Sequence, residues 1–440
     1  MKLQQINDKK TSGKRVFGLV TAISLVIANM IGTGLFTTTG FLVEEMQNSL
    51  SVLLLWFVGG IFALSGALTY GEIGANLPRS GGEYHYLSQL IHPIAGFLAG
   101  WISLIVGFSA PVAAVSIAFA KYLNSVFEFL PVMMLAIGAI VLFSGLHLWN
   151  VKAGSKVQNI ITAMKVLLIL LFVAGGLWLS PGKSLNSMSN GFQPESVFSP
   201  AFAVGLVFVM YAYSGWNATS YIAGELKKPT KNLPIALFTG TFIVLVLYMA
   251  VNYFFLTIVP AHTISGKIEV GHYVAAELFG SKGGNIISIL IAFFLLSALS
   301  AMIMAGPRVY QVIGEDYPWF KKLSRVSSKG APVYAILLQM IIAIIMVVTF
   351  AFDTILVYVG FTLSLVSGLT VAGVFVLRKR LPEKENKFKV PGYPLTPLIF
   401  LIIAAWMVVH ALVERPLAAI AGIVTLSLGV VVFYLSRNKV

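Results

Sequence analysis

The sequence predicts an all-α polytopic membrane protein with 12 transmembrane helices, arranged as two inverted five-helix repeats (5+5) followed by helices 11 and 12. Three observations lead to this fold class. Of the 440 residues, 58% are hydrophobic and only 10% are charged, whereas a soluble domain has about 25% charged residues. Twelve segments are long enough to span a bilayer. Polar, glycine-containing breaks interrupt the first helix of each five-helix block, as expected for inverted repeats.

Eleven of the 12 predicted spans contain no Lys, Arg, Asp or Glu, and the remaining span contains only Lys165. About 20 apolar residues cross the hydrocarbon, so each segment can be one helix. The third segment is longer than an upright span, which predicts a tilted helix that starts below the membrane. In chain order the segments are 16–43, 46–71, 84–120, 129–151, 157–182, 196–224, 232–266, 283–307, 330–352, 354–377, 390–413 and 416–436.

The basic residues determine the expected orientation. The formal net charge of +14 would by itself suggest a nucleic-acid partner. With both termini in the cytoplasm, 24 of the 30 Lys and Arg residues lie in inner segments and five lie in outer loops. This asymmetry is the positive-inside pattern, and it accounts for the charge without a nucleic acid. We therefore expect a multi-pass protein of the cytoplasmic membrane that is surrounded by lipid and binds no nucleic acid.

A charged segment after the tenth span divides the chain. We expect a ten-helix core at 1–378, with helices 1–5 at about 16–182 and helices 6–10 at about 196–378. A cytoplasmic linker at 379–389 then leads to helices 11 and 12 and a C-terminal tail at 390–440. The Lys-rich start resembles a signal peptide. The apolar run that follows is too long and has no small-residue cleavage site, so we expect it to remain as helix 1.

The break in the first span reads Asn29-Met30-Ile31-Gly32-Thr33-Gly34. Irregular backbone at membrane depth persists only where it faces protein, water or a ligand. Taken alone, these small residues also suit close helix packing. A second break at 211–220 provides a counterpart, 183 residues further on when Gly215 is compared with Gly32. Free N–H groups at half-helix starts can hold a carboxylate, and freed carbonyls suit an ammonium. Together the breaks predict a site for a zwitterion.

Lys165 is the only basic residue well inside a predicted span. One interpretation is a lysine whose apolar stem lies along the helix while its ammonium reaches the interface. The other is a cation buried against carbonyls or hydroxyls. A buried cation could take the place of a coupling metal ion, or it could carry a proton.

The loop between the second and third spans mixes charge, Pro and Gly, and it contains Glu72, Arg79 and Glu83. Either it is a capping turn with solvated charges, or its charges hold or gate neighbouring helices. The six His residues form no i,i+4 pair and have no acidic neighbours of metal-site spacing, so we expect no metal. There is no Walker-type phosphate loop. We expect no cofactor, and nothing in these patterns indicates an enzyme.

Six stretches, in order from helix 1 to helix 8, match one known group of proteins. By these stretches the chain resembles the amino acid–polyamine–organocation (APC) superfamily, and within it the bacterial relatives of the L-type amino acid transporters (LAT). The stretches are IGTGLF at 31–36, EIGANLPRSGGEYHY at 72–86, VQN at 157–159 together with Lys165, YSGWN at 213–217, GELKKPTKNLP at 224–234 and GPRVY at 306–310.

The resemblance implies a LeuT-like fold that moves amino acids by alternating access. The substrate carboxylate would lie on the amides of the Gly-Thr-Gly sequence, the amino group would meet freed carbonyls, and Tyr211 would be the gate. Lys165 would replace a sodium ion between helices 1, 5 and 8, with Ser297 or Ser300 as partners. The implied substrate-binding residues are Met30, Ile31, Gly32, Thr33, Gly34, Tyr211, Ser214, Trp216 and Asn217.

The resemblance also implies partners and a substrate class. The animal members are disulfide-bonded to a second subunit. This chain has no cysteine, so we expect a stand-alone bacterial permease of the inner membrane. Neither break contains an acidic residue, which favours neutral amino acids. We expect sodium-independent transport by exchange or by proton symport, with an amino acid and lipid, and in the second case protons, as partners. A cationic amino acid or polyamine carrier is one alternative, and a membrane sensor on the same fold is another.

Overall fold

The computed structural model describes residue 15 and residues 17–149, 154–179, 194–327, 331–382 and 385–437. Parts of the orientation prediction, including residues 1–14 and 180–193, lie outside the described residues. So do the side chains of 157–159, one of the stretches that carry the resemblance. All named elements of the described chain are helices. One isolated parallel β-bridge joins Phe17 to Leu226.

The elements follow in chain order, with α for α-helices and η for 3-10 or π-helices. They are α1 (Leu19–Met30), α2 (Gly34–Met46), α3 (Ser49–Asn76), α4 (Gly82–Leu90), α5 (Pro93–Ile102), η1 (Ser103–Ser109), α6 (Ala110–Asn124), α7 (Val132–Trp149), α8 (Gly154–Leu179), η2 (Pro194–Phe198), α9 (Pro200–Tyr213), η3 (Ala218–Glu225), α10 (Pro229–Ile258), α11 (Ala261–Ile264), α12 (Val270–Asp316), η4 (Pro318–Ser324), α13 (Val333–Thr349), α14 (Phe352–Arg380), α15 (Leu395–Glu414) and α16 (Pro416–Arg437).

The described residues form nine helices that are long and apolar enough to cross a membrane, or ten if the bent pair α1 and α2 is one span. Two shorter apolar helices lie at Ala163–Leu179 and Val333–Thr349. The outer helices expose bulky apolar side chains, for example Leu171 on α8 and Ile402 on α15. Water disfavours such surfaces and lipid accepts them. The prediction of an all-helical, multi-pass membrane protein is confirmed.

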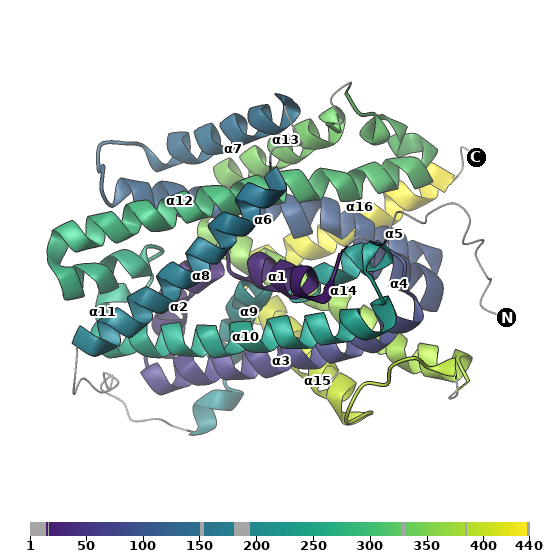
Figure 1. Ribbon diagram of the computed structural model, residues 1–440, viewed down its shortest axis with the longest axis horizontal. Coiled ribbons are helices and arrows are strands. Elements are labelled where there is room, and N and C mark those ends of the chain that lie inside the picture. The colour runs from purple at the N-terminus through teal and green to yellow at the C-terminus, as the bar shows by residue number, and fades with distance from the viewer. Residues whose placement is uncertain are drawn as a thin grey trace.

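The broken helix α1–α2 lies in the middle of the bundle (Figure 1). On one side α1 packs against α10, which runs along α3, and α1 also contacts η3. A second group of helices, α6, α7, α12 and α13, packs together elsewhere in the bundle. The C-terminal helices α15 and α16 are not separate from the rest, because α15 packs on α3 and α9 while α16 packs on α5 and α14.

A buried ion pair attaches the segment before α15 to the core. The Glu72 side chain is fully buried at the end of α3. Its carboxylate accepts hydrogen bonds from Arg378 Nε (2.8 Å) and Nη2 (2.7 Å) on α14. It also accepts from Asn386 Nδ2 (2.7 Å) and from the Val390 amide (2.6 Å). Of the two interpretations of the 72–83 loop, the one in which its charges hold neighbouring helices together therefore describes Glu72. Arg79, in contrast, is exposed.

We expect Glu72→Ala to lower the thermal stability of the protein strongly. The substitution leaves the Arg378 guanidinium partly buried without its anion, and breaking a buried pair costs about 3–5 kcal/mol. Thermal unfolding in detergent, followed by size-exclusion chromatography, measures the loss. Glu385→Ala is the control, because Glu385 is exposed on the same segment. An unchanged melting temperature for Glu72→Ala would contradict the structural role.

Candidate functional site

The first break opens the helix between α1 and α2, which meet at an angle of 42°. α1 ends at Met30, and the Gly32 amide turns back to donate to the Met30 carbonyl (2.8 Å). In the part of the chain that the structure describes, the amides of Thr33, Gly34 and Leu35 have no acceptor. These groups lie at the start of α2, where unpaired N–H groups and the helix dipole favour an anion. The break can therefore hold a carboxylate.

The second break follows α9, and it lies directly against the first. Ser214 leaves the helix with extended backbone angles (φ −54°, ψ 141°), and Gly215 has a φ of +99°. A Cβ on Gly215 would lie 2.9 Å from the Asn29 Cβ and 3.0 Å from its carbonyl carbon. A Cβ on Gly34 would lie 2.4 Å from the Ala212 Cα. Only glycine at these two positions allows the breaks to touch.

A tyrosine of α10 joins the two breaks, and sequence reasoning did not identify it. The Tyr248 hydroxyl lies 2.5 Å from the Met30 carbonyl oxygen and 3.0 Å from the Ala212 carbonyl oxygen. Each carbonyl belongs to the last turn of a half-helix, where the oxygens have no intrahelical donor. The available signal was a tyrosine in an apolar span, since a buried phenol must find a polar partner. The Met30 carbonyl thus already accepts two hydrogen bonds, from Gly32 and from Tyr248.

Tyr211 lies over the start of α2. Its hydroxyl is 2.6 Å from the Thr33 hydroxyl, and its side chain is buried. Its own carbonyl accepts from the Ser214 amide (3.1 Å). The Tyr211 side chain therefore connects the second break to Thr33 at the start of α2, in addition to the backbone contacts between the two breaks.

The other two predicted pocket residues point to different surroundings. Trp216 packs edge-on against Tyr70 of α3, with ring centroids 4.7 Å apart, and against Phe400 of α15 at 6.0 Å. Asn217 donates from Nδ2 to Glu83 Oε1 (2.6 Å). Both side chains therefore extend from the second break toward α3, α4 and α15. Within the residues that the structure describes, neither forms a hydrogen bond or a ring contact with the first break.

Lys165 is buried beside the first break. Its side chain is 3% exposed, and its Nζ donates to the Ile31 carbonyl (3.1 Å). The ammonium is thus directed into the bundle and not toward the interface. Of its two expected partners on α12, Ser297 is buried, while the Ser300 hydroxyl lies 2.9 Å from His147 Nε2 on α7. The positive charge lies next to the point where α1 unwinds.

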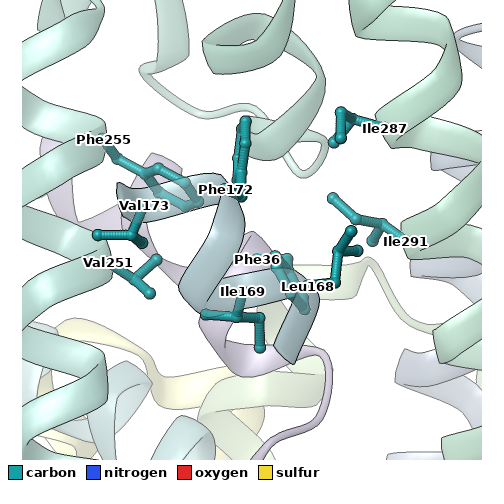
Figure 2. Close-up of a pocket in the computed structure, with 9 residues that line it drawn as sticks. All are labelled: Phe36, Leu168, Ile169, Phe172, Val173, Val251, Phe255, Ile287 and Ile291. Carbon is teal, nitrogen blue, oxygen red and sulfur yellow. The ribbon is translucent and has the colours of Figure 1, made fainter. Parts of the chain in front are cut away.

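A small apolar cavity lies beside this site, between α2, α8, α10 and α12 (Figure 2). Its volume is about 10 Å³, and its lining offers no polar partner. This volume is near the minimum that one water molecule needs. It is therefore too small and too apolar for a zwitterion, and it leaves packing space next to α2. The lining residues are Phe36, Leu168, Ile169, Phe172, Val173, Val251, Phe255, Ile287 and Ile291.

Comparison with known proteins gives consistent matches over nearly the whole chain. A family model described as amino acid permease matches residues 17–435. The human b(0,+)-type amino acid transporter 1 is 29% identical over 425 residues, which are 94% of this chain and 86% of the relative. The serine/threonine exchanger SteT of Bacillus subtilis is 31% identical over 392 residues, 88% of each chain. The mouse large neutral amino acids transporter small subunit 2 is 29% identical over 439 residues, 96% of this chain and 81% of the relative.

Proposed function

Because the chain belongs to the amino acid permease family, we propose that it carries neutral L-amino acids across the cytoplasmic membrane by alternating access, without sodium. Amino acid transport is common to the family and to these relatives, and they are transporters and not enzymes. The observation that carries the finer proposal is the contact between the two breaks. Free amides of α2, carbonyls at the ends of α1 and α9, and the Lys165 ammonium all lie at this contact, which supports the proposal of a single site.

The proposed architecture has 12 spans in two inverted repeats plus two further helices. The broken pairs α1–α2 and α9–η3 are spans 1 and 6, which begin the two repeats. The shorter helices Ala163–Leu179 and Val333–Thr349 add to the ten apolar spans to give 12. In this scheme the transport core is 1–378 and the linker is 379–389. Both termini are cytoplasmic, and the permease acts without a disulfide-linked subunit.

The amides at the start of α2 are the proposed carboxylate site. Gly32, Thr33 and Gly34 were expected there; because the Gly32 amide is used by Met30, the Leu35 amide takes the third place. The substrate ammonium would meet carbonyls of Met30, Tyr211 or Ser214, and at Met30 it would displace the Tyr248 hydroxyl. Tyr211 is the proposed gate, since its hydroxyl is hydrogen-bonded to the Thr33 hydroxyl at the start of α2.

Neutral substrates are favoured over cationic ones by the charges around the breaks. The carboxylate that reaches the second break is that of Glu83, and its contacts are Tyr70, Asn217 and Tyr221. Those donors already occupy the carboxylate. The relatives' names include serine/threonine and large neutral amino acids, and they also include a b(0,+) type. A cationic substrate is therefore the second outcome that the uptake test must resolve.

Uptake of labelled amino acids into proteoliposomes tests the proposal. We expect saturable uptake of neutral amino acids that is unchanged when choline replaces sodium, because Lys165 already supplies a cation beside the first break. Preloading with unlabelled substrate separates exchange, which needs the internal pool, from proton symport. Preferred uptake of arginine, lysine or polyamines would establish the cationic alternative. Absence of flux for every amino acid, together with a substrate-induced thermal shift, would indicate a sensor.

Tyr248→Phe should reduce transport while the protein stays folded. Removal of the hydroxyl takes away the donor that the Met30 and Ala212 carbonyls share. Met30 keeps the Gly32 amide as a donor, whereas Ala212 loses its donor, and an unsatisfied buried group costs about 1–3 kcal/mol. We expect the ratio of maximal rate to KM to fall about tenfold. Tyr358→Phe is the matched control, since its buried hydroxyl pairs with Thr425 on α16, which belongs to neither break. Equal kinetics for the two variants would remove Tyr248 from the site.

A further inference from the structure

Glu83 carries a buried carboxylate beneath the second break. The side chain is at the start of α4, and the residue is 6% exposed. Oε1 accepts from the Asn217 amide nitrogen (2.6 Å) and the Tyr70 hydroxyl (3.0 Å), and Oε2 lies 2.5 Å from the Tyr221 hydroxyl. No Lys, Arg or His side chain of the described chain forms an ion pair with it. A buried carboxylate is thus held by neutral donors alone.

These contacts join the start of α4 to η3, the half of the second broken helix that follows the break. Two backbone contacts strengthen the junction. The Gly81 amide donates to the Tyr221 carbonyl (3.2 Å), and the Gly224 amide donates to the Ser80 hydroxyl oxygen (3.1 Å). Movement of η3 away from α4 therefore has to break the Glu83 contacts.

η3 is also hydrogen-bonded to α1, the half of the first broken helix that precedes the break, and to the residues before α1. The Thr219 hydroxyl donates to the Ala22 carbonyl (2.9 Å). The Lys227 amide donates to the Phe17 carbonyl (2.9 Å), and the Phe17 amide donates to the Glu225 carbonyl (3.2 Å). α1 and η3 are thus one unit. Glu83 lies on the chain that continues through α5 and η1 into α6, which packs with α7 and α12 instead.

The junction accepts either protonation state of Glu83. An ionised carboxylate accepts from all three donors. In the acid form, its O–H can donate to the Tyr221 oxygen, because a hydroxyl both donates and accepts. The Tyr221 hydroxyl can then turn to Ser103, which its side chain also contacts. Proton gain at Glu83 therefore does not force the junction apart, whereas exposure to water favours the ionised form.

We propose that Glu83 is the proton-binding residue of the cytoplasmic gate: it holds a proton while η3 is docked on α4, and it releases that proton to cytoplasmic water when η3 moves away. The inference rests on the proposed transport function, and it assigns the coupling proton to a carboxylate and not to Lys165. Glu83 precedes the membrane span at Pro93–Asn124, so the released proton has a short path to the inner aqueous phase.

The sign of the pH dependence follows from burial. Desolvation raises the pKa of the Glu83 carboxyl above its ordinary value, against the opposing effect of hydrogen bonds from Tyr221 and Tyr70. In the open gate, water restores the ordinary pKa. Proton-linked stabilisation of the docked gate is therefore complete below the ordinary pKa and is lost as the pH rises through the raised value. Alkaline cytoplasmic pH should open the gate.

The other titratable groups near Glu83 are already engaged or do not form a charge pair with it. α3 contributes Tyr70 and Glu72, of which Glu72 is bound to Arg378. α5 contains no titratable residue. The remaining groups are Arg79, Tyr84, His85, Tyr86 and His92 around α4, Tyr221 and Glu225 on η3, and Arg378, Lys379 and Arg380 at the end of α14; the Tyr84 hydroxyl donates to Asp316. Burial lowers the pKa of His85 to about 4, so it stays neutral across the relevant range.

The absence of cysteine in the chain allows a direct test. Ser220→Cys places one thiol on η3, where the native side chain is fully buried. Its modification rate by a membrane-impermeant thiosulfonate is measured in inside-out vesicles from pH 5 to 8, without substrate. Division by the rate at an exposed thiol, Lys321→Cys, corrects for ionisation of the thiol itself. We expect the normalised rate to rise with pH by up to about tenfold per unit, the limit for one proton.

Glu83→Gln in the same background mimics the protonated form, and it should give a low rate that does not change with pH. Glu225→Gln is the matched control on η3 and should keep the full pH response. A flat response in the unmodified background, a persistent response in Glu83→Gln or a raised rate in Glu83→Gln would each overturn the proposal. Folding of each variant is verified by a size-exclusion profile and a melting temperature equal to those of the unmodified background. Tyr221→Phe provides a second variant, which should shift the pH midpoint of the modification rate.

Uptake in proteoliposomes separates this inference from the proposed function. We expect external acid to stimulate uptake by the unmodified protein and not by Glu83→Gln. Amino acid flux with no pH response in either assay would overturn the role of Glu83 and leave the permease in place. A pH response of the thiol without flux of any amino acid would overturn the permease instead.

Discussion

Lys165→Ala should reduce amino acid flux about tenfold to a hundredfold while the protein remains folded. The ammonium is buried and donates to the Ile31 carbonyl at the first break. Hydrogen bonds to charged groups contribute about 1.5–3 kcal/mol, and an equilibrium between two conformations shifts about tenfold for each 1.4 kcal/mol. Without the cation, the unwound segment loses the charge that holds it next to α8. Flux of a neutral amino acid into proteoliposomes measures the effect.

Two further variants separate the effect of the Lys165 charge from the effects of side-chain volume and of removing any lysine. Lys165→Met keeps most of the side-chain volume and removes the charge, so it should behave as Lys165→Ala if the ammonium matters. Lys321→Met removes an exposed lysine on η4 and should leave flux unchanged. Sodium-dependent flux in Lys165→Ala would indicate that the lysine occupies a cation site. Wild-type kinetics in both Lys165 variants would reduce it to a packing residue.

Gly34→Val should abolish transport and weaken substrate binding. The Gly34 Cα faces the backbone of α9, where an added Cβ would lie 2.4 Å from the Ala212 Cα and 2.5 Å from its Cβ. Backbone cannot rotate away as a side chain can, so α2 must shift, and overpacking costs about 1–3 kcal/mol. The shift moves the free amides of α2 away from the carbonyls of the second break. The two halves of a zwitterion site then no longer meet.

A substrate-induced thermal shift across the 20 amino acids measures this binding independently of flux. Gly34→Ala should already be deleterious, because the conflict is at the Cβ. Gly175→Ala is the control, since a Cβ at that position in α8 has no atom within 4 Å. Normal substrate affinity in Gly34→Val would place the carboxylate elsewhere.

The sequence predicted the membrane fold class because the hydrocarbon core of a bilayer restricts which residues a spanning segment can contain. Long uncharged segments and basic inner loops follow directly from the cost of burying charge. The boundaries were less predictable. The charged segment at 379–389 was expected to begin at the end of the tenth span, whereas α14 extends to Arg380 and α15 begins only at Leu395. Helix ends depend on local contacts, here those of Glu72 with Arg378 and Val390.

The sequence alone determined that helix 1 is interrupted near Gly32, that helix 6 is interrupted near Gly215 and that one lysine lies within a span. Each of these is a local property of residue type. The tertiary structure decided which groups meet: Lys165 with Ile31 across 134 positions, and Tyr248 with Met30 across 218. It also decided that Glu83, named beforehand only as a loop charge, lies beneath the second break. Such contacts depend on helix packing, which residue periodicity does not encode for segments that are apolar on every face.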